Sequence, residues 1–136
     1  MIRFEALALA ISNLNGGLND PDSKAFKLHN PGLLKTYRPE KKKDGDNYRI
    51  FTSVMGGFKA LIAELQARCS GKNHRLTPDN TLSDMLALYS VTDDRAIRQI
   101  VLFIRRALQD DSVAASTRLA WFQETAEQSV EIEQEK

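Results

Sequence analysis

The 136-residue sequence predicts a mainly helical α+β fold, with one helix, a small irregular β region and then four helices. Three observations lead to this prediction. Apolar residues recur at spacings of three and four over most of the chain, as on one face of an amphipathic helix. That spacing is absent from residues 18–53, which are rich in turn-forming Asn, Asp, Pro and Gly. An apolar content of 42% suffices for a single compact core in a chain of this length.

The first helix is predicted near the N-terminus, where an apolar stripe ends at Asn15-Gly16-Gly17. Asn before Gly is a common way to end a helix in the left-handed conformation. The stripe consists of Phe4, Leu7, Ala8, Ile11 and Leu14. In the irregular region that follows, residues 48–52 are the best strand candidate, because aromatic and β-branched residues stand beside a turn. Residues 26–28 are the candidate partner strand.

Two helices are predicted between residues 53 and 89. The first starts after Ser53 and ends at Ser70-Gly71. Its buried face is formed by Phe58, Leu61, Ile62, Leu65 and Cys69. The second starts at Thr81 and Asp84, which have the spacing of a capping pair. Its apolar residues are Leu82, Met85, Leu86 and Tyr89.

Two more helices are predicted before an acidic tail. Asp93 or Asp94 caps the first of them. Its apolar stripe is formed by Ile97, Ile100, Val101, Ile104 and Leu108. The second is expected to start near Ser112 and to hold Trp121 near its edge. It is expected to bury Val113, Leu119 and Phe122. Residues 124–136 contain five Glu and one Lys, and this tail is expected to fray because it has too little apolar surface to offset ordering.

Charge and cysteine content argue against several functions. The chain carries 19 Lys and Arg against 18 Asp and Glu, a net charge of +1, which does not suit a strongly basic nucleic-acid binder. Its one cysteine, Cys69, falls on a buried helix face, so a core role is expected. His29, His74 and Cys69 lack paired ligand spacing, so neither a metal nor a cofactor is expected. The absence of a signal peptide and of an apolar window of about 18 residues predicts cytoplasmic synthesis and no membrane span.

Two features leave a structural and a functional interpretation open. Residues 35–43 carry five Lys or Arg around Tyr37. The functional interpretation is that the cations bind phosphates or that Tyr37 stacks on a base or a sugar. The structural interpretation is a solvated loop. Asp44 and Asp46 follow directly and dilute its charge. The Gly-Gly pair at residues 56–57 also has two interpretations. The structural one is a helix start or a close approach by another backbone, and the functional one is the wall of a cleft that admits a flat ligand.

Five pieces of the chain, taken in order, resemble a family of small phage-associated proteins with a lysozyme-like fold, marked by an Asn-Pro-Gly turn. The pieces are residues 10–17, residues 29–34 with Asn30-Pro31-Gly32, residues 49–53, residues 57–61, and residues 81–86 with Tyr89. The resemblance implies one domain over residues 1–123, with a helical lobe of residues 54–122, a small irregular β lobe of residues 18–53 and a cleft between them. It also implies peptidoglycan as the ligand, because members cleave or hold cell-wall glycan strands as parts of virions or lysis systems.

The same resemblance reveals a departure at the catalytic position. The family carries Glu followed by Gly at the end of the first helix, as the expected general acid, whereas this chain has Asn15. An amide cannot deliver a proton to the leaving oxygen of a glycosidic bond. In the turn, His29 and Leu33 replace Asn residues that the family favours. We therefore expect acid catalysis to be lost at this position.

Three functional hypotheses follow. The first is a degenerate, non-hydrolytic lysozyme-like protein of phage or prophage origin that binds cell-wall glycan or serves as a virion or assembly component. The residues expected near its cleft are Asn15, His29, Asn30, Tyr37, Arg49 and Tyr89. The second is an active muramidase or transglycosylase that uses a displaced carboxylate, for which Glu40 and Asp20 are weak candidates. The third is an inhibitor-like module that binds a phage or host protein through the same scaffold. If the alignment is shifted by a few residues, Asn15 only ends the helix.

Overall fold

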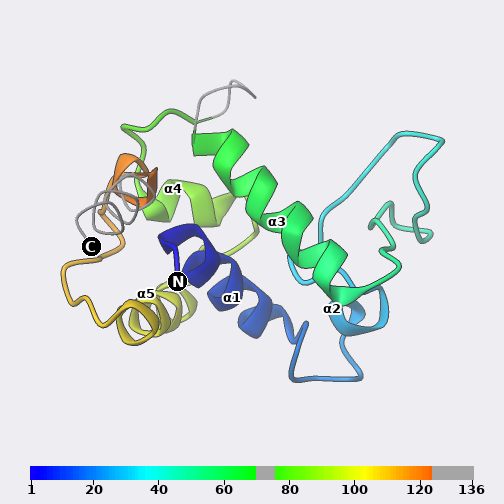
Figure 1. Cartoon of the computed structure of the whole chain (residues 1–136), viewed down its shortest axis with the longest axis horizontal. Coiled ribbons are helices and arrows are strands. Elements are labelled where there is room, and N and C mark those ends of the chain that lie inside the picture. Colours follow the sequence, from blue (N-terminus) through cyan, green and yellow to red (C-terminus); the bar gives the residue numbers. More distant parts are fainter. Residues whose placement is uncertain (70–75, 124–136) are drawn as a thin grey trace, which may run out of the picture. The chain divides into compact units, whose positions relative to one another are not determined.

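The computed structural model describes residues 1–69 and 76–123, and regular structure in this part of the chain is mainly helical, as predicted. The helices are α1 (Arg3–Asn15), α2 (Lys24–Lys27), α3 (Val54–Cys69), α4 (Leu82–Ala87) and α5 (Asp94–Leu108) (Figure 1). Contacts divide the chain into two compact units. The turn unit comprises Ala8–Ala63, and the C-terminal unit comprises Met1–Leu7 with the described residues from Glu64 onward.

Helix α1 begins and ends close to the predicted positions. Four residues of the predicted stripe are buried, namely Phe4, Leu7, Ala8 and Ile11. Leu14 is 38% exposed and does not belong to the buried face. After the helix, Gly16 takes a φ of 78° and Gly17 N–H donates to Ser12 O at 2.9 Å. The left-handed residue is therefore Gly16 rather than Asn15, because glycine has no Cβ to clash in this conformation.

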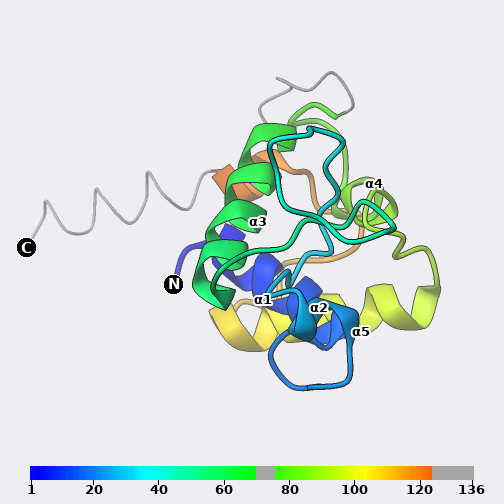
Figure 2. The same ribbon diagram turned by 90° about the vertical axis from the view of Figure 1, so that its right-hand side faces the viewer.

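Both predicted strands are wrong. Residues 26–28 fall within and just after α2, where the Ser23 hydroxyl accepts a hydrogen bond from Phe26 N–H at 3.1 Å and caps the helix. Residues 48–52 form only isolated bridges. Their hydrogen bonds join Arg49 N to Leu34 O, Ile50 N to Lys42 O and Phe51 N to Leu28 O. Because these acceptors belong to separate segments, no ladder forms, and Figure 2 shows residues 35–50 as an irregular loop.

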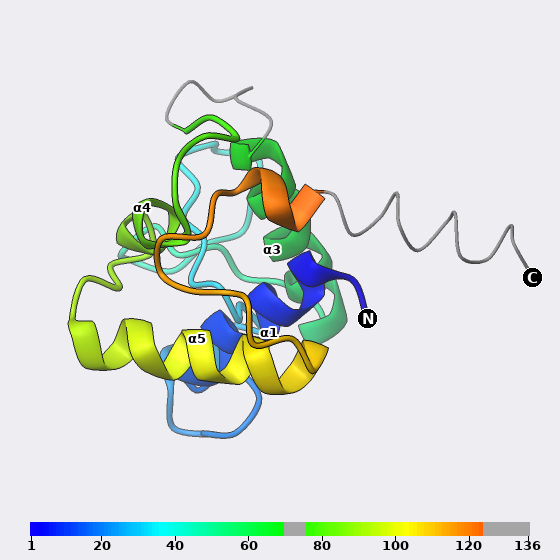
Figure 3. The same ribbon diagram turned by 90° about the vertical axis from the view of Figure 1, so that its left-hand side faces the viewer.

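The next three helices begin where local chemistry predicts. Helix α3 starts directly after Ser53, and its predicted stop at residues 70–71 lies outside the described residues. Thr81 and Asp84 form the reciprocal capping box of α4, with hydrogen bonds of 3.2 and 3.0 Å. Asp93 caps α5 by accepting a backbone N–H three residues on at 3.1 Å. Figure 3 shows α4 leading through a short connection into α5.

The helix predicted from Ser112 is wrong, because helical structure resumes only at Ala120. The backbone of residues 115–119 instead pairs with the start of α4. The hydrogen bonds join Leu82 N to Thr117 O, Ser83 N to Ala115 O and Leu119 N to Asn80 O. Backbone groups used in this way cannot also form helical hydrogen bonds. The apolar residues predicted there are still buried, namely Val113, Leu119 and Phe122. Trp121 is half-buried.

Three further predictions concern the thiol, the membrane and the tail. Cys69 is fully buried, and burial raises the pKa of its thiol to about 12, so the thiol stays protonated and unreactive. No helix in residues 1–69 and 76–123 is long and apolar enough to cross a membrane. The acidic tail predicted over residues 124–136 lies outside the described residues.

Candidate functional site

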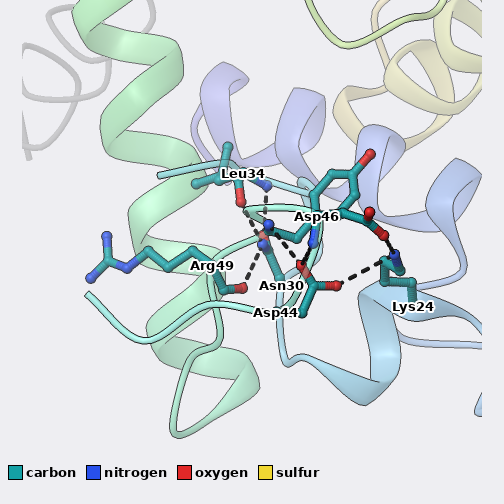
Figure 4. Close-up of polar contacts among 7 residues, drawn as sticks. Lys24, Asn30, Leu34, Asp44, Asp46 and Arg49 are labelled. Carbon is teal, nitrogen blue, oxygen red and sulfur yellow. Dashed lines mark hydrogen bonds and ion pairs between the residues drawn. The ribbon is translucent and has the colours of Figure 1, made fainter. Parts of the chain in front are cut away.

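The Asn30-Pro31-Gly32 turn is held in shape by the side chain of Asn30 (Figure 4). This side chain is completely buried. Its Nδ2 donates to Leu34 O at 2.9 Å and to Arg49 O at 2.8 Å, and its Oδ1 accepts from Leu34 N–H at 2.9 Å. Both amide protons are used by the protein, so Asn30 supports the turn and has no donor left for a ligand.

Helix α3 packs against this turn at Gly57, which has no side chain. A Cβ added to Gly57 would overlap the carbonyl oxygen of His29 and lie 2.8 Å from Pro31 Cδ. Its neighbour Gly56 has much more room, since a Cβ there would meet only Ser53 Oγ at 3.3 Å. The interpretation of the Gly-Gly pair as a close approach by another backbone is therefore confirmed for Gly57.

Asn15 lies at the end of α1 and is bonded to the same turn. Its Nδ2 donates to Pro31 O at 3.0 Å, and the side chain is half-buried. Its Oδ1 has no hydrogen-bond partner within the described ranges 1–69 and 76–123. An amide in this position can donate and accept hydrogen bonds but cannot supply a proton to a leaving group.

One turn before Asn15, α1 buries a hydroxyl without a partner. Ser12 Oγ makes no hydrogen bond to the part of the chain that the structure describes, and a Cβ on Gly17 would lie 2.9 Å from it. A buried polar atom in this state carries a desolvation cost that nothing offsets. We expect Ser12→Ala to raise the free energy of unfolding by about 1 kcal/mol, measured by urea denaturation.

The same substitution at Ser23 is the matched control. Ser23 Oγ donates to Gly16 O at 2.9 Å and accepts from Phe26 N–H at 3.1 Å. Ser23→Ala should therefore lower the free energy of unfolding by about 1 kcal/mol. A loss of stability in Ser12→Ala as large as in Ser23→Ala would show that the Ser12 hydroxyl stabilises the fold, contrary to this prediction.

His29, Arg49 and Phe51 form a polar and aromatic group in the turn unit. His29 is exposed and adopts a left-handed φ of 52°. Its Nδ1 lies 3.1 Å from Phe51 O, so the Nδ1 proton is donated to that carbonyl. The Arg49 guanidinium carbon lies 4.4 Å from the centroid of the Phe51 ring, within cation–π range. The turn unit thus contains five of the six predicted residues, namely Asn15, His29, Asn30, Tyr37 and Arg49.

The two predicted tyrosines have different surroundings. Tyr37, in the turn unit, is 73% exposed. Tyr89 belongs to the C-terminal unit, where its hydroxyl donates to Glu64 Oε1 at 3.0 Å. Arg68 donates to the same oxygen from Nε at 2.9 Å and from Nη2 at 2.7 Å. Burial, followed by the Glu64 charge, raises the pKa of Tyr89, which keeps this phenol protonated.

Sequence reasoning missed Glu64 and Arg68 as partners of Tyr89. The available signal was their spacing of four residues on α3, which places the two side chains on one helix face. That spacing does not indicate which residue from outside the helix joins them. Their cluster with Tyr89 is therefore a product of packing within the C-terminal unit.

The weak catalytic candidates, Asp20 and Glu40, are exposed loop side chains. Asp20 Oδ1 accepts from Asp22 N–H at 3.0 Å, which is a local turn contact. A glycosidase general acid needs a sheltered setting that keeps its carboxyl protonated near neutral pH. Neither of these exposed side chains has such a setting.

Lys24 binds the two aspartates that follow the basic stretch (Figure 4). Its Nζ lies 2.9 Å from Asp46 Oδ2 and 3.4 Å from Asp44 Oδ2. The hydrogen bond that Lys24 donates to the Asp46 carboxylate raises the pKa of Lys24. Burial by itself raises the pKa of Asp44, but hydrogen bonds from the Tyr48 and Asp46 backbone and from Lys24 outweigh it, so this pKa lies below its ordinary value. Lys24 therefore binds both carboxylates, and the Asp44 carboxylate also accepts hydrogen bonds from the backbone N–H groups of Asp46 and Tyr48.

No three His, Cys, Asp or Glu side chains among the described residues lie close enough together to hold a metal ion. No protein-family model, no curated protein and no solved structure matches this chain. Function is therefore inferred from the resemblance of the five sequence pieces and from the geometry around the Asn-Pro-Gly turn.

Proposed function

We propose that this chain is a degenerate lysozyme-like protein of phage or prophage origin that binds cell-wall glycan without cleaving it, as a virion or assembly component. The single observation that supports the proposal most is the state of Asn15. At the position where the resembled family carries its general acid, this chain has an amide that donates to Pro31 O. A site that has lost its acid can still hold its ligand, because binding and proton transfer depend on different groups.

The surroundings of Asn15 also support the proposal. Pro31 belongs to the Asn-Pro-Gly turn by which the resemblance is identified, so the Asn15 amide is hydrogen-bonded directly to this turn. The Asn15 Oδ1, which has no hydrogen-bond partner among the described residues, is suited to accept a hydrogen bond from a sugar hydroxyl. A glutamate side chain there would face the Pro31 carbonyl, and a carbonyl acceptor favours the protonated carboxyl that a general acid requires.

The test is an incubation of the purified protein with isolated peptidoglycan, followed by sedimentation. We expect the natural chain to appear in the pellet and no muropeptides to appear in the supernatant. The Asn15→Glu variant should still bind, since a glutamate oxygen can also accept a hydrogen bond, and it should release muropeptides, because it restores an acid beside the turn. The natural chain should not gain activity at any pH, since an amide does not titrate in this range.

Asn13→Glu is the matched control for the added charge. Asn13 is exposed on the same helix, where its Oδ1 accepts from Asn19 Nδ2 at 2.7 Å. This variant should bind peptidoglycan and release nothing. Muropeptide release by the natural chain would overturn the proposal. If that release were then lost in Glu40→Ala or Asp20→Ala, the displaced-carboxylate enzyme would take its place. Failure to bind peptidoglycan at all would instead favour a protein-binding module.

A further inference from the structure

The basic loop, defined as residues 35–43, is the most concentrated positive segment of the described chain. Its cationic side chains are those of Lys35, Arg38, Lys41, Lys42 and Lys43, with one carboxylate at Glu40. Lys35, Arg38 and Lys42 are exposed. Tyr37 stands among them with 73% of its surface exposed. A large aromatic side chain left this open on a loop is available to stack on a flat or ring-shaped ligand.

The structure changes the charge balance that the sequence suggests for this loop. Asp44 and Asp46 follow it directly, yet both carboxylates are bound by Lys24. Within residues 1–69 and 76–123, Arg38 and Lys42 form no ion pair. Lys24 offsets one of the two negative charges, and residues 35–46 carry five Lys or Arg against three Asp or Glu, so this segment keeps a net positive charge that can attract an anionic ligand.

The loop is also held in place by backbone hydrogen bonds at both of its ends. Thr36 N–H donates to Asn47 O at 2.9 Å, and Ile50 N–H donates to Lys42 O at 2.9 Å. The Lys35 ammonium lies 4.9 Å from the centroid of the Tyr48 ring, a further contact at the base of the loop. A loop that is already ordered loses less conformational entropy on binding than a free one.

We propose that the basic loop binds the carboxylate groups of an anionic cell-wall glycan, with Tyr37 stacked on a sugar ring. This inference rests on the proposed function and names the ligand chemistry of one surface of the turn unit. A carbohydrate strand whose sugar rings carry carboxylate-bearing peptides as branches presents the two features that this loop matches. Nucleic acid fits this loop less well. Binding along a phosphate backbone needs a wider basic surface than a chain of net charge +1 offers.

The test compares sedimentation of the double variant Arg38→Gln/Lys42→Gln with that of the natural chain on purified peptidoglycan sacculi. Both side chains are exposed, so the fold should be retained. We expect binding at low ionic strength to weaken about tenfold, from the loss of two surface charge contacts. On sacculi whose carboxyl groups have been converted to neutral amides, the natural chain and the variant should bind equally. Tyr37→Ser should weaken binding to both kinds of sacculi.

The matched control is Arg95→Gln/Arg98→Gln, which removes the same charge from exposed positions on α5. It should bind like the natural chain. If the loop variant binds intact sacculi as tightly as this control, the inference is overturned while the proposed function stands. If the natural chain does not bind sacculi, the proposed function is overturned, and the inference that rests on it is overturned as well. If the natural chain binds a mixed-sequence single-stranded oligonucleotide more tightly than sacculi, and the loop variant loses that binding, the ligand is nucleic acid and the inference is overturned.

Discussion

Gly57→Ala is expected to lower the free energy of unfolding by about 3 kcal/mol or more, a large part of the stability of a domain this size. The added Cβ would overlap His29 O and lie 2.8 Å from Pro31 Cδ. Neither obstacle is the end of a flexible side chain, since one is backbone and the other belongs to a proline ring. Relief therefore requires α3 or the Asn-Pro-Gly turn to move, which would disturb the packing that holds both.

The neighbouring substitution Gly56→Ala is the control for this prediction. Its Cβ would meet only the Ser53 hydroxyl, at 3.3 Å. Alanine is preferred to glycine in a helix by up to about 1 kcal/mol, so this variant should be neutral or slightly more stable. Urea denaturation followed by circular dichroism measures both variants. Equal midpoints for the two alanine variants would show that the close approach of Gly57 to the turn does not exist in solution.

Asn30→Asp is expected to be the second most damaging substitution. The natural amide donates to Leu34 O and Arg49 O from a completely buried side chain. Replacing the amide by a carboxylate removes both donors and places a charge against two carbonyl oxygens. Each buried acceptor left without its donor costs about 1 to 3 kcal/mol, so we expect a loss of about 3 kcal/mol or more at neutral pH.

This loss should depend on pH in a defined direction. Burial and the two carbonyl oxygens favour the protonated form of the introduced carboxyl, so its pKa in the folded chain lies above the unfolded value of about 3.9. The folded variant then binds more protons than the unfolded one, and its stability falls as pH rises through the folded pKa. Relative to the natural chain, the variant should be least destabilised below about pH 4.

Asn13→Asp provides the comparison for that pH dependence. Asn13 is exposed and its Oδ1 already acts as an acceptor from Asn19, so an aspartate there keeps the contact. Its stability difference from the natural chain should be small at every pH. If the difference for Asn30→Asp stays constant between acidic and neutral pH, the buried carboxyl does not titrate as argued, and the network around Asn30 is more open than the structure indicates.

Local signals in the sequence predicted most of the helices. The apolar stripe of α1, the capping box at Thr81 and Asp84 and the cap at Asp93 each depend on residues within one or two turns of each other. Such interactions are readable because the helical period and the capping geometry are intrinsic to the backbone. The prediction failed for residues 48–52, whose hydrogen-bond acceptors lie in separate segments of the chain.

The candidate site divides in the same way. The Asn-Pro-Gly turn, the helix end at Asn15 and the unusual Gly57 were visible in the sequence. The burial of Asn30 was not, because a turn residue is ordinarily expected to be exposed. The distribution of charge around the basic loop was not visible either, because nothing local indicates that Lys24 binds the two aspartates that follow it.

By itself, the sequence determined the helical class, most helix starts and the presence of an amide, Asn15, at the end of the first helix. Only the tertiary structure decided that Asn30 is structural, that Gly57 is required by a carbonyl of the turn and that residues 115–119 pair with the start of α4. The reason is physical. Helix periodicity and capping are set by neighbours a few residues away, whereas the partners of a buried amide or a bare glycine are set by chain segments that meet only on folding.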